Sequence, residues 1–200
     1  MASKDRILRL KDETRINILD AAMRIVKLEG WPALSMRKIA DEIEYTAPII
    51  YEYFANKEAI ILELTRKGYL ILSRELEEAK AKHRLACHQL DAMWTAYWNF
   101  AFAKKELYQA MFGLSNNCSC ELINDLPEAE LPWDIITPAI GELMKITDMD
   151  SPAICTKYYT FWSVVHGLIS INISSRGFSD EINRQVLKDA IGGMITSITA

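Results

Sequence analysis

The chain has little of what a metal protein needs. It holds four cysteines and three histidines in 200 residues, and no two cysteines form a CxxC pair. Cys118 and Cys120 are neighbours, but His83, His88 and His166 lie far from them in sequence. We therefore expect no metal site, and we interpret Cys87, Cys118, Cys120 and Cys155 as the reduced thiols of a cytoplasmic protein.

Groupings that indicate catalysis are also missing. The sequence shows no paired carboxylates, no triad-like arrangement and no glycine-rich phosphate loop. We expect no enzymatic activity and no cofactor. A helical-bundle enzyme stays open as an alternative, and finding a turnover substrate would identify it.

Uninterrupted apolar runs are scarce. The N-terminus has no apolar segment typical of a signal peptide. Residues 158–175 carry no formal charge and are long enough to span a membrane. Seven polar side chains interrupt this run, namely Thr160, Ser163, His166, Ser170, Asn172, Ser174 and Ser175. A helix buried among other helices explains it better, so we expect no contact with a membrane.

An excess of positive charge is absent as well. The 23 Lys and Arg face 27 Asp and Glu, a net charge of −4, which argues against nucleic-acid binding over the whole surface. Residues 1–57 hold ten basic and nine acidic side chains, so a DNA contact would need a local patch. Within residues 1–15, five basic side chains outnumber three acidic ones. This segment fits a flexible arm that follows DNA or a solubilising tail equally well.

Apolar residues recur at helical spacing along almost the whole chain, and this pattern predicts an all-α fold. In residues 14–30 the stripe consists of Ile18, Leu19, Ala22, Ile25 and Val26, and Gly30 is the expected stop. A long helix is predicted from about Lys57 to about Lys82, spanning roughly 40 Å. Further helices are expected within 88–113, around 134–147, from Pro152 to about Ser175, and from Asp180 to about Ile198, with the longest irregular region at 113–134.

The segment 46–54, TAPIIYEYF, could be a strand or a short helix. In a strand, Ile50, Glu52 and Phe54 would share a face, which would place a carboxylate in the core. In a helix, Ile50, Tyr53 and Phe54 share the buried face and Glu52 points away. Pro48 would then lie in the first turn, where its missing N–H costs nothing. We therefore predict a short helix.

Three polar residues precede predicted helices and can accept a hydrogen bond from a first-turn N–H. Ser35 precedes the helix of residues 36–43, Thr46 precedes the short helix, and Asn56 precedes the long helix. Two short helices joined at Glu44-Tyr45-Thr46 have the shape of a helix-turn-helix, whose second helix enters the DNA major groove. Two packing helices of an ordinary bundle would look similar, so geometry alone leaves both readings open.

The residues themselves favour DNA binding. The stretch LSMRKIADEIEYTAPIIYEYFANKEAI resembles the DNA-binding domain of the TetR family of bacterial transcriptional regulators. The matching positions are Ile39-Ala40, Pro48, Ile50-Tyr51, Tyr53-Phe54 and Asn56-Lys57-Glu58, and the resemblance covers about residues 12–64. Two positions depart from it, because Glu44 stands where the family often has glycine and Ile49 where it often has a hydroxyl residue.

The resemblance implies a role for each matching side chain. Tyr51 and Lys57 would bind DNA phosphates. Ser35 and Arg37, at the start of the supporting helix, would also contact the DNA backbone. The residues that would face the floor of the groove, where apolar atoms contact thymine methyl groups, are Thr46, Ala47, Pro48 and Ile49. The departure at Ile49 implies that one phosphate contact is lost.

The resemblance further implies a C-terminal helical domain that binds a ligand and dimerises, over residues 58–200, after a DNA-binding domain over residues 1–57. Residues 159–171 are similar to the Trp-His-Gly signature of one subgroup, carried here by Trp162, His166 and Gly167. The expected effector-binding residues are Trp94, Tyr97, Trp98, Phe102, Met111, Phe112, Trp133, Trp162 and His166. Plain core packing is the alternative at each of these positions, and a structural role is favoured for His166.

The last helix predicts a dimer. Gly192 and Gly193 lie inside it, and each costs roughly 1 kcal/mol against alanine unless another helix approaches closely. Its apolar residues cover much of its circumference, which calls for partners on two sides. We expect the last two helices of each chain to form a four-helix interface through Ile169, Ile173, Val186, Ala190, Gly193 and Met194.

Together these features predict a transcriptional repressor that binds an inverted-repeat operator in double-stranded DNA as a homodimer and is released by a small apolar or aromatic effector. The alternative is a dimeric DNA-binding protein without an effector. Two recognition helices must lie roughly 34–36 Å apart to enter successive major grooves, and a ligand could change that spacing.

Overall fold

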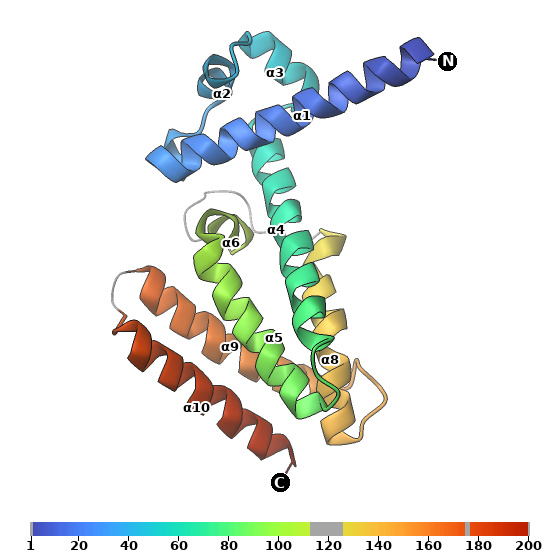
Figure 1. Cartoon of the computed structure of the whole chain (residues 1–200), viewed down its shortest axis with the longest axis vertical. Helices are drawn as coiled ribbons and strands as arrows, with labels where there is room; N and C mark the ends of the chain where they lie inside the picture. Colours follow the sequence, from blue (N-terminus) through green and yellow to red (C-terminus); the bar gives the residue numbers. More distant parts are fainter. Residues whose placement is uncertain (1, 113–125, 175–176, 200) are drawn as a thin grey trace. The chain divides into compact units, whose positions relative to one another are not determined.

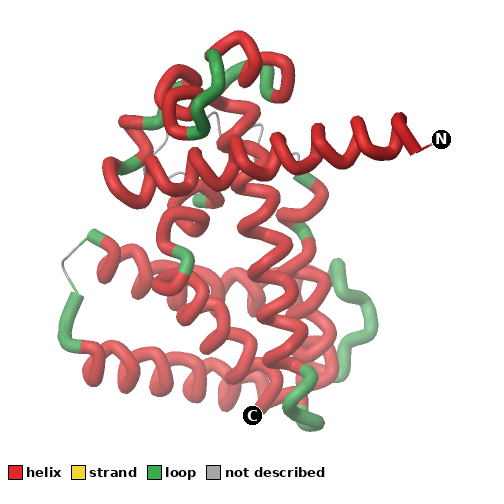
Figure 2. Tube along the Cα trace, turned by 45° about the horizontal axis from the view of Figure 1, so that its top comes forward, coloured by secondary structure: helices red, strands yellow, loops and turns green. Residues whose placement is uncertain are grey.

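The computed structural model describes residues 2–112, 126–174 and 177–199, most of which lie in helices (Figures 1 and 2). These ranges contain no β-strand, and the predicted all-α class is confirmed. Cys118, Cys120 and most of the predicted irregular region fall outside them. The chain divides into two compact units, residues 1–68 with 106–126, and residues 69–105 with 127–200. The boundary expected from the sequence, after residue 57, lies eleven residues nearer the N-terminus than the one between Gly68 and Tyr69.

The first unit consists of one long helix, the start of a second long helix, and several short helices. It contains α1 (Ala2–Glu29), the 3-10 turn η1 (Trp31–Ala33), α2 (Met36–Glu42), α3 (Ala47–Tyr53), the start of α4 (Lys57–Lys80), and most of α6 (Lys105–Met111). Its fully buried side chains include Ile18, Ile39, Ile50, Ile60 and Leu64, which come from four different helices. Because α2 and α3 have only seven residues each, this shared core must stabilise them.

Helix α1 begins much earlier than the apolar stripe suggests. It starts at Ala2, so the flexible arm that was one alternative for this segment is replaced by helix. Residues 2–13 hold no glycine or proline and are rich in Leu, Arg and Lys, which favour helix. Ile7, Leu8 and Leu10 on this extension stay about half exposed.

The predicted helix caps divide into two that form and one that does not. Ser35 Oγ accepts the Lys38 N–H at 3.2 Å, and Asn56 Oδ1 accepts the Ala59 N–H at 2.8 Å. Thr46 occupies the cap position of α3 without a side-chain hydrogen bond, so that prediction is wrong. The second helical residue, Pro48, has no N–H to offer, and the Ile49 N–H is already bonded to the Thr46 carbonyl at 3.0 Å.

The second unit is a bundle around α5. It contains the rest of α4, α5 (Ala86–Ala103), the 3-10 turn η2 (Pro127–Ala129), α8 (Leu131–Met144), α9 (Pro152–Ile173) and α10 (Asp180–Thr199). Helix α5 packs against α8, α9 and α10. The predicted helix within 88–113 is broken at Lys104, where φ is −129° and ψ is 45°. None of the helices in the described ranges has the length and apolarity needed to cross a membrane.

Helix α8 contains a proline in its interior, Pro138. Pro138 cannot donate to the carbonyl four residues earlier, and its ring crowds that turn. The adjacent Ile135 carbonyl accepts a hydrogen bond from Lys80 Nζ at 2.9 Å. This bond ties the end of α4 to α8 within the second unit.

Helices α9 and α10 lie side by side as a hairpin (Figure 1). A reciprocal pair of amides joins them. Asn183 Nδ2 donates to Asn172 Oδ1 at 2.6 Å, and Asn172 Nδ2 donates to Asn183 Oδ1 at 3.2 Å. Asn183 is only 4% exposed and also donates to the Phe178 carbonyl at 3.0 Å. A buried amide with this many partners is well satisfied and fixes how the two helices align.

Candidate functional site

The turn between α2 and α3 contains Glu44, the residue that stands where the family often has glycine. Glu44 has φ of 58°, in the left-handed region that glycine adopts without cost. The Tyr45 N–H bonds to the Ala40 carbonyl at 2.9 Å and the Glu44 N–H to the Asp41 carbonyl at 3.3 Å. These two bonds are those of the Schellman motif that ends many helices. The turn therefore has the backbone conformation that glycine favours. Holding a glutamate in that conformation costs about 1–2 kcal/mol.

Helix α3 has one buried and one outward face. Ile50 and Phe54 anchor it, with exposed fractions of 0% and 3%. Pro48, Tyr51 and Glu52 point outward, and Tyr51 is 54% exposed. Of the other residues predicted to face DNA, Thr46 is exposed, and Ala47 and Ile49 are half-buried. Tyr53, predicted to share the buried face, is half-buried.

The predicted phosphate-binding residues begin two other helices of the same unit. Arg37 is exposed near the start of α2, beside Ser35, which is half-buried. Lys57 is the first residue of α4. The free N–H groups of a helix N-terminus attract phosphate, and an added cation strengthens that attraction. The predicted phosphate-binding side chains thus lie near the starts of α2 and α4, the helices that precede and follow α3 in the chain.

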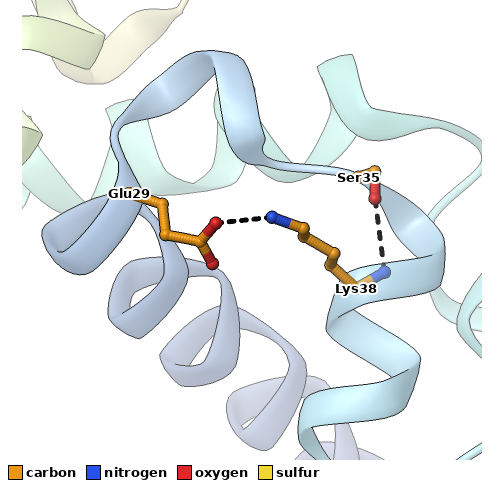
Figure 3. Close-up of polar contacts among 3 residues, drawn as sticks. All are labelled: Glu29, Ser35 and Lys38. Atoms are coloured by element: carbon orange, nitrogen blue, oxygen red, sulfur yellow. Dashed lines mark hydrogen bonds and ion pairs between the residues drawn. The ribbon is translucent and has the colours of Figure 1, made fainter.

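Ion pairs connect α1 to the helices on either side of this surface. Lys38 Nζ lies 2.6 Å from Glu29 Oε2 (Figure 3), and Arg24 Nε lies 2.9 Å from Glu42 Oε1. The other two pairs reach α4, with Arg15 3.1 Å from Glu63 and Lys67 3.5 Å from Asp20. The Arg15 guanidinium also lies 4.5 Å above the Phe54 ring. Sequence reasoning missed these contacts because the partners lie 9 to 48 residues apart.

The second unit gathers the aromatic side chains of α5, α8 and α9. The Trp94 ring stacks on Phe161 with centroids 5.5 Å apart and meets the edge of Tyr97 at 5.9 Å. The Tyr97 hydroxyl lies 3.0 Å from His166 Nδ1, and Trp162 stacks on the His166 ring at 4.6 Å. We call these five residues, together with Tyr158 and Trp133, whose rings are 4.7 Å apart, the aromatic cluster.

Most predicted effector residues belong to this cluster or adjoin it. Trp94 and Tyr97 are buried, and Trp133, Trp162 and His166 are half-buried. Trp98 packs on Phe102 at 4.7 Å, and Phe102 is 41% exposed. The prediction omitted Phe161 and Tyr158, although both lie near the Trp-His-Gly positions on the same helix.

Met111 and Phe112 belong to the first unit. A methyl group placed on Gly68 of α4 would lie 2.7 Å from Met111 Sδ, so the bare glycine lets α6 approach closely. Gly68 is therefore a position where helix packing, rather than backbone conformation, requires glycine.

The aromatic cluster is electrically neutral. Burial lowers the pKa of His166 below its ordinary 6.5 and raises the pKa of Tyr158, and burial also raises the pKa of Tyr69 to about 12. The Trp94 indole N–H is buried and has no hydrogen-bond partner among the described residues. An unpaired buried donor is costly, and it marks a place where a ligand acceptor would be favourable.

A groove of about 610 Å³ lies elsewhere in the second unit, between α4 and α8. Leu70, Leu131 and Ile135 give it apolar walls, and Arg74, Glu77, Lys80 and Asp134 add charges of both signs. None of the predicted effector residues lines this groove. The described residues contain no group of three or more His, Cys, Asp and Glu side chains placed to hold a metal ion.

The predicted dimer residues are spread over α9 and α10. Val186 is 42% exposed and Gly193 is exposed, while Ile173, Ala190 and Met194 are half-buried. Ile169 is fully buried within its own chain. A Cβ added at Gly167, Gly192 or Gly193 would meet no atom of the described residues within 4 Å. Packing inside the single chain therefore does not account for these three helical glycines.

Two family profiles match the chain. Residues 18–64 match "Bacterial regulatory proteins, tetR family", and residues 90–190 match "Tetracyclin repressor-like, C-terminal domain". An uncharacterized HTH-type transcriptional regulator of Haemophilus influenzae is 29% identical over 90 residues, which span 45% of this chain and 48% of that relative. The chain thus aligns with about half of that protein.

Solved structures share the fold at low identity. A TetR-family transcriptional regulator from Streptomyces coelicolor superposes with a TM-score of 0.70 at 15% identity, over 99% of this chain and 96% of that one. The regulator FadR from Bacillus subtilis, solved in complex with stearoyl-CoA, superposes with a TM-score of 0.69 at 18% identity, over 89% of this chain and 98% of that one. The helix-turn-helix geometry and the matches over both halves of the chain lead to one conclusion: the chain belongs to the TetR family of bacterial transcriptional regulators, which bind DNA.

Proposed function

We propose that this regulator is a repressor that binds an inverted-repeat operator as a homodimer and is released by a small apolar or aromatic effector. The observation that supports DNA binding is the outward face of α3, a helix that Ile50 and Phe54 anchor in the core. Arg37 of α2 and Lys57 of α4 come before and after this helix in the chain. Tyr51 at 54% exposure has its hydroxyl available for a phosphate. Pro48 and Ile49 offer apolar atoms to thymine methyl groups.

Selection of bound DNA from a random pool by the full-length protein tests the proposed DNA binding. We expect an inverted repeat with half-sites about one helical turn apart, because a two-fold symmetric dimer presents its recognition helices in that way. Affinity should fall steeply with added salt as phosphate counterions are released. Recovery of a single unrepeated site, or of no preferred sequence, would contradict the proposal.

The proposed effector site is the aromatic cluster. The unpartnered Trp94 N–H would donate to an acceptor on the ligand, and the surrounding rings would cover an apolar or aromatic body. The stearoyl-CoA of the Bacillus subtilis structure belongs to that protein. The phosphates of a CoA thioester would need cations, and this cluster offers none, so a compact neutral compound fits better.

Release would occur through a shift between two conformations. Helix α4 begins at Lys57 and extends into the second unit, so a ligand that favours one position of its second half also biases its first half. The effector must bind the two conformations with different affinity to change the spacing of the recognition helices. A compound panel should contain ligands that raise the melting temperature and release DNA. Compounds that stabilise the protein and leave DNA affinity unchanged would oppose this mechanism.

The homodimer would form through α9 and α10. The open space beside Gly167, Gly192 and Gly193 lets the backbone of a second copy approach closely, which offsets the roughly 1 kcal/mol that each helical glycine costs. Val186, Ala190 and Met194 would pack around that contact, with Ile169 supporting it from inside its own chain. Mass photometry and sedimentation at micromolar concentration should show a dimer, and a monomer alone would contradict this part.

A further inference from the structure

Helix α3 carries one charged side chain, and its sign is unusual for a surface that meets DNA. The sequence of the helix is APIIYEY, and Glu52 is its single charge. Glu52 is exposed, and its carboxylate forms no hydrogen bond or ion pair with the other described residues. It therefore brings an uncompensated carboxylate to the DNA-facing surface.

The burial pattern fixes where this carboxylate points. Ile50 and Phe54 mark the inner face of α3, and Pro48 is exposed on the other side. Glu52 follows Pro48 by four residues, so the two side chains lie on the same outward face. Tyr51, the proposed phosphate ligand, is directly beside Glu52 in sequence and projects 100° away around the helix.

A carboxylate on this face must find a donor on the DNA or oppose binding. Phosphates repel it, and so do the acceptors of the major groove, which are guanine O6 and N7, adenine N7 and thymine O4. The two exocyclic amino groups, cytosine N4 and adenine N6, are the donors that remain. Adenine places its N7 acceptor beside the amino group, which repels a carboxylate, whereas cytosine carries no acceptor at its own major-groove edge.

We propose that Glu52 reads the 4-amino group of one cytosine in each operator half-site. The inference rests on the proposed function, because it requires α3 to lie in the major groove. In this role Glu52 also raises specificity by weakening binding wherever no amino group meets it. The cost in non-specific affinity would be compensated only at the correct base pair.

Selection of bound DNA with four full-length proteins tests the proposal. The wild type should enrich one C·G pair at a fixed position of each half-site. Glu52→Gln should change the preference at that position alone, toward A·T, because an amide can bond both N6 and N7 of adenine. Glu52→Ala should lose the preference there. Asp41→Asn, an exposed carboxylate of α2 with the same change of charge, should select the wild-type sequence.

A binding titration supplies the size of the effect. Replacing the selected C·G pair by T·A should weaken wild-type binding roughly fivefold to tenfold and leave Glu52→Ala binding unchanged. If Glu52→Gln and Glu52→Ala select the wild-type bases at every position, or if the wild type enriches adenine where Glu52→Gln differs, the proposal is overturned. If none of the four proteins selects any sequence, the proposed function fails together with it.

Discussion

Each unit has a buried aliphatic core, but the other contacts between helices differ: the first unit adds ion pairs, whereas the second adds aromatic rings and amides. Around α1 the contacts are Arg15–Glu63, Arg24–Glu42 and two further ion pairs, all of them partly exposed. In the second unit the corresponding contacts are the Trp94–Phe161 stack, the Tyr97–His166 hydrogen bond and the Asn172–Asn183 pair. The contacts of the second unit suit the neutral compound that it is proposed to bind, whereas the ion pairs of the first unit hold α1 against α2 and α4.

The difference matters for stability as well. Exposed ion pairs contribute at most about 1 kcal/mol each and weaken in salt. Buried rings contribute several times more and do not depend on salt. The ring contacts of the second unit should therefore contribute more stability than the ion pairs of the first unit, and only the latter should weaken in salt.

Removal of the central ring should have the largest effect. Phe161 is fully buried and stacks on Trp94. We expect Phe161→Ala to lower the free energy of unfolding by about 3–5 kcal/mol, because it leaves a cavity in the cluster. Chemical denaturation measures this. Phe102→Ala, at a ring that is 41% exposed, is the matched control and should cost much less. Equal losses for the two variants would show that the stack is not central.

Breaking the amide pair should cost less. Asn183→Ala leaves the Asn172 side chain without its partner on α10, and we expect a loss of about 1–3 kcal/mol. The same variant should loosen the α9–α10 hairpin, which hydrogen exchange of both helices would detect. The exposed Gln185 lies on the same helix, and its side chain donates to the exposed Asp189, so Gln185→Ala serves as the control and should be nearly neutral.

The caps and the core stripes of this chain could be predicted from sequence because they depend on residues close together. Ser35 and Asn56 bond to N–H groups three residues later, and such local geometry is readable directly. The cap predicted at Thr46 does not form for an equally local reason, because Pro48 has no N–H to donate to the threonine hydroxyl.

Contacts between distant segments could not be predicted. Nothing near Arg15 in the sequence indicates Glu63, and nothing near Gly68 indicates Met111. The aromatic stripe of α5 was visible, but the partner that stacks on Trp94 comes from α9, and hydrophobic spacing does not reveal which rings meet across a bundle.

Acid should destabilise the second unit through His166. Burial lowers its folded-state pKa below the value of 6.5 expected in the unfolded chain. Below pH 6.5 the unfolded state therefore binds more protons, and stability falls until the pH passes below the folded-state pKa. Melting temperatures between pH 8 and pH 5 measure this, and His166→Gln should flatten that part of the profile. A wild-type profile that matches the variant would exclude His166 as the cause.

The smallest expected effect belongs to the first unit. A double-mutant cycle on Arg24 and Glu42 should give a coupling of roughly 0.2–1 kcal/mol, because both side chains are about half exposed. The coupling should nearly vanish in 1 M salt. A large coupling that persists in salt would mean that the ion pairs, rather than the shared core, hold the helix-turn-helix together.

The central claim is that α3 and the residues flanking it bind DNA. The most direct test is the affinity for the selected operator of a double variant, Tyr51→Phe with Lys57→Ala. Both side chains are proposed to bind phosphates beside α3, so the variant should bind at least tenfold more weakly and show a smaller salt dependence. Arg84→Ala, an exposed cation of the second unit, should bind like the wild type. Full affinity of the double variant would contradict the assignment of α3 and its flanks as the DNA-binding surface.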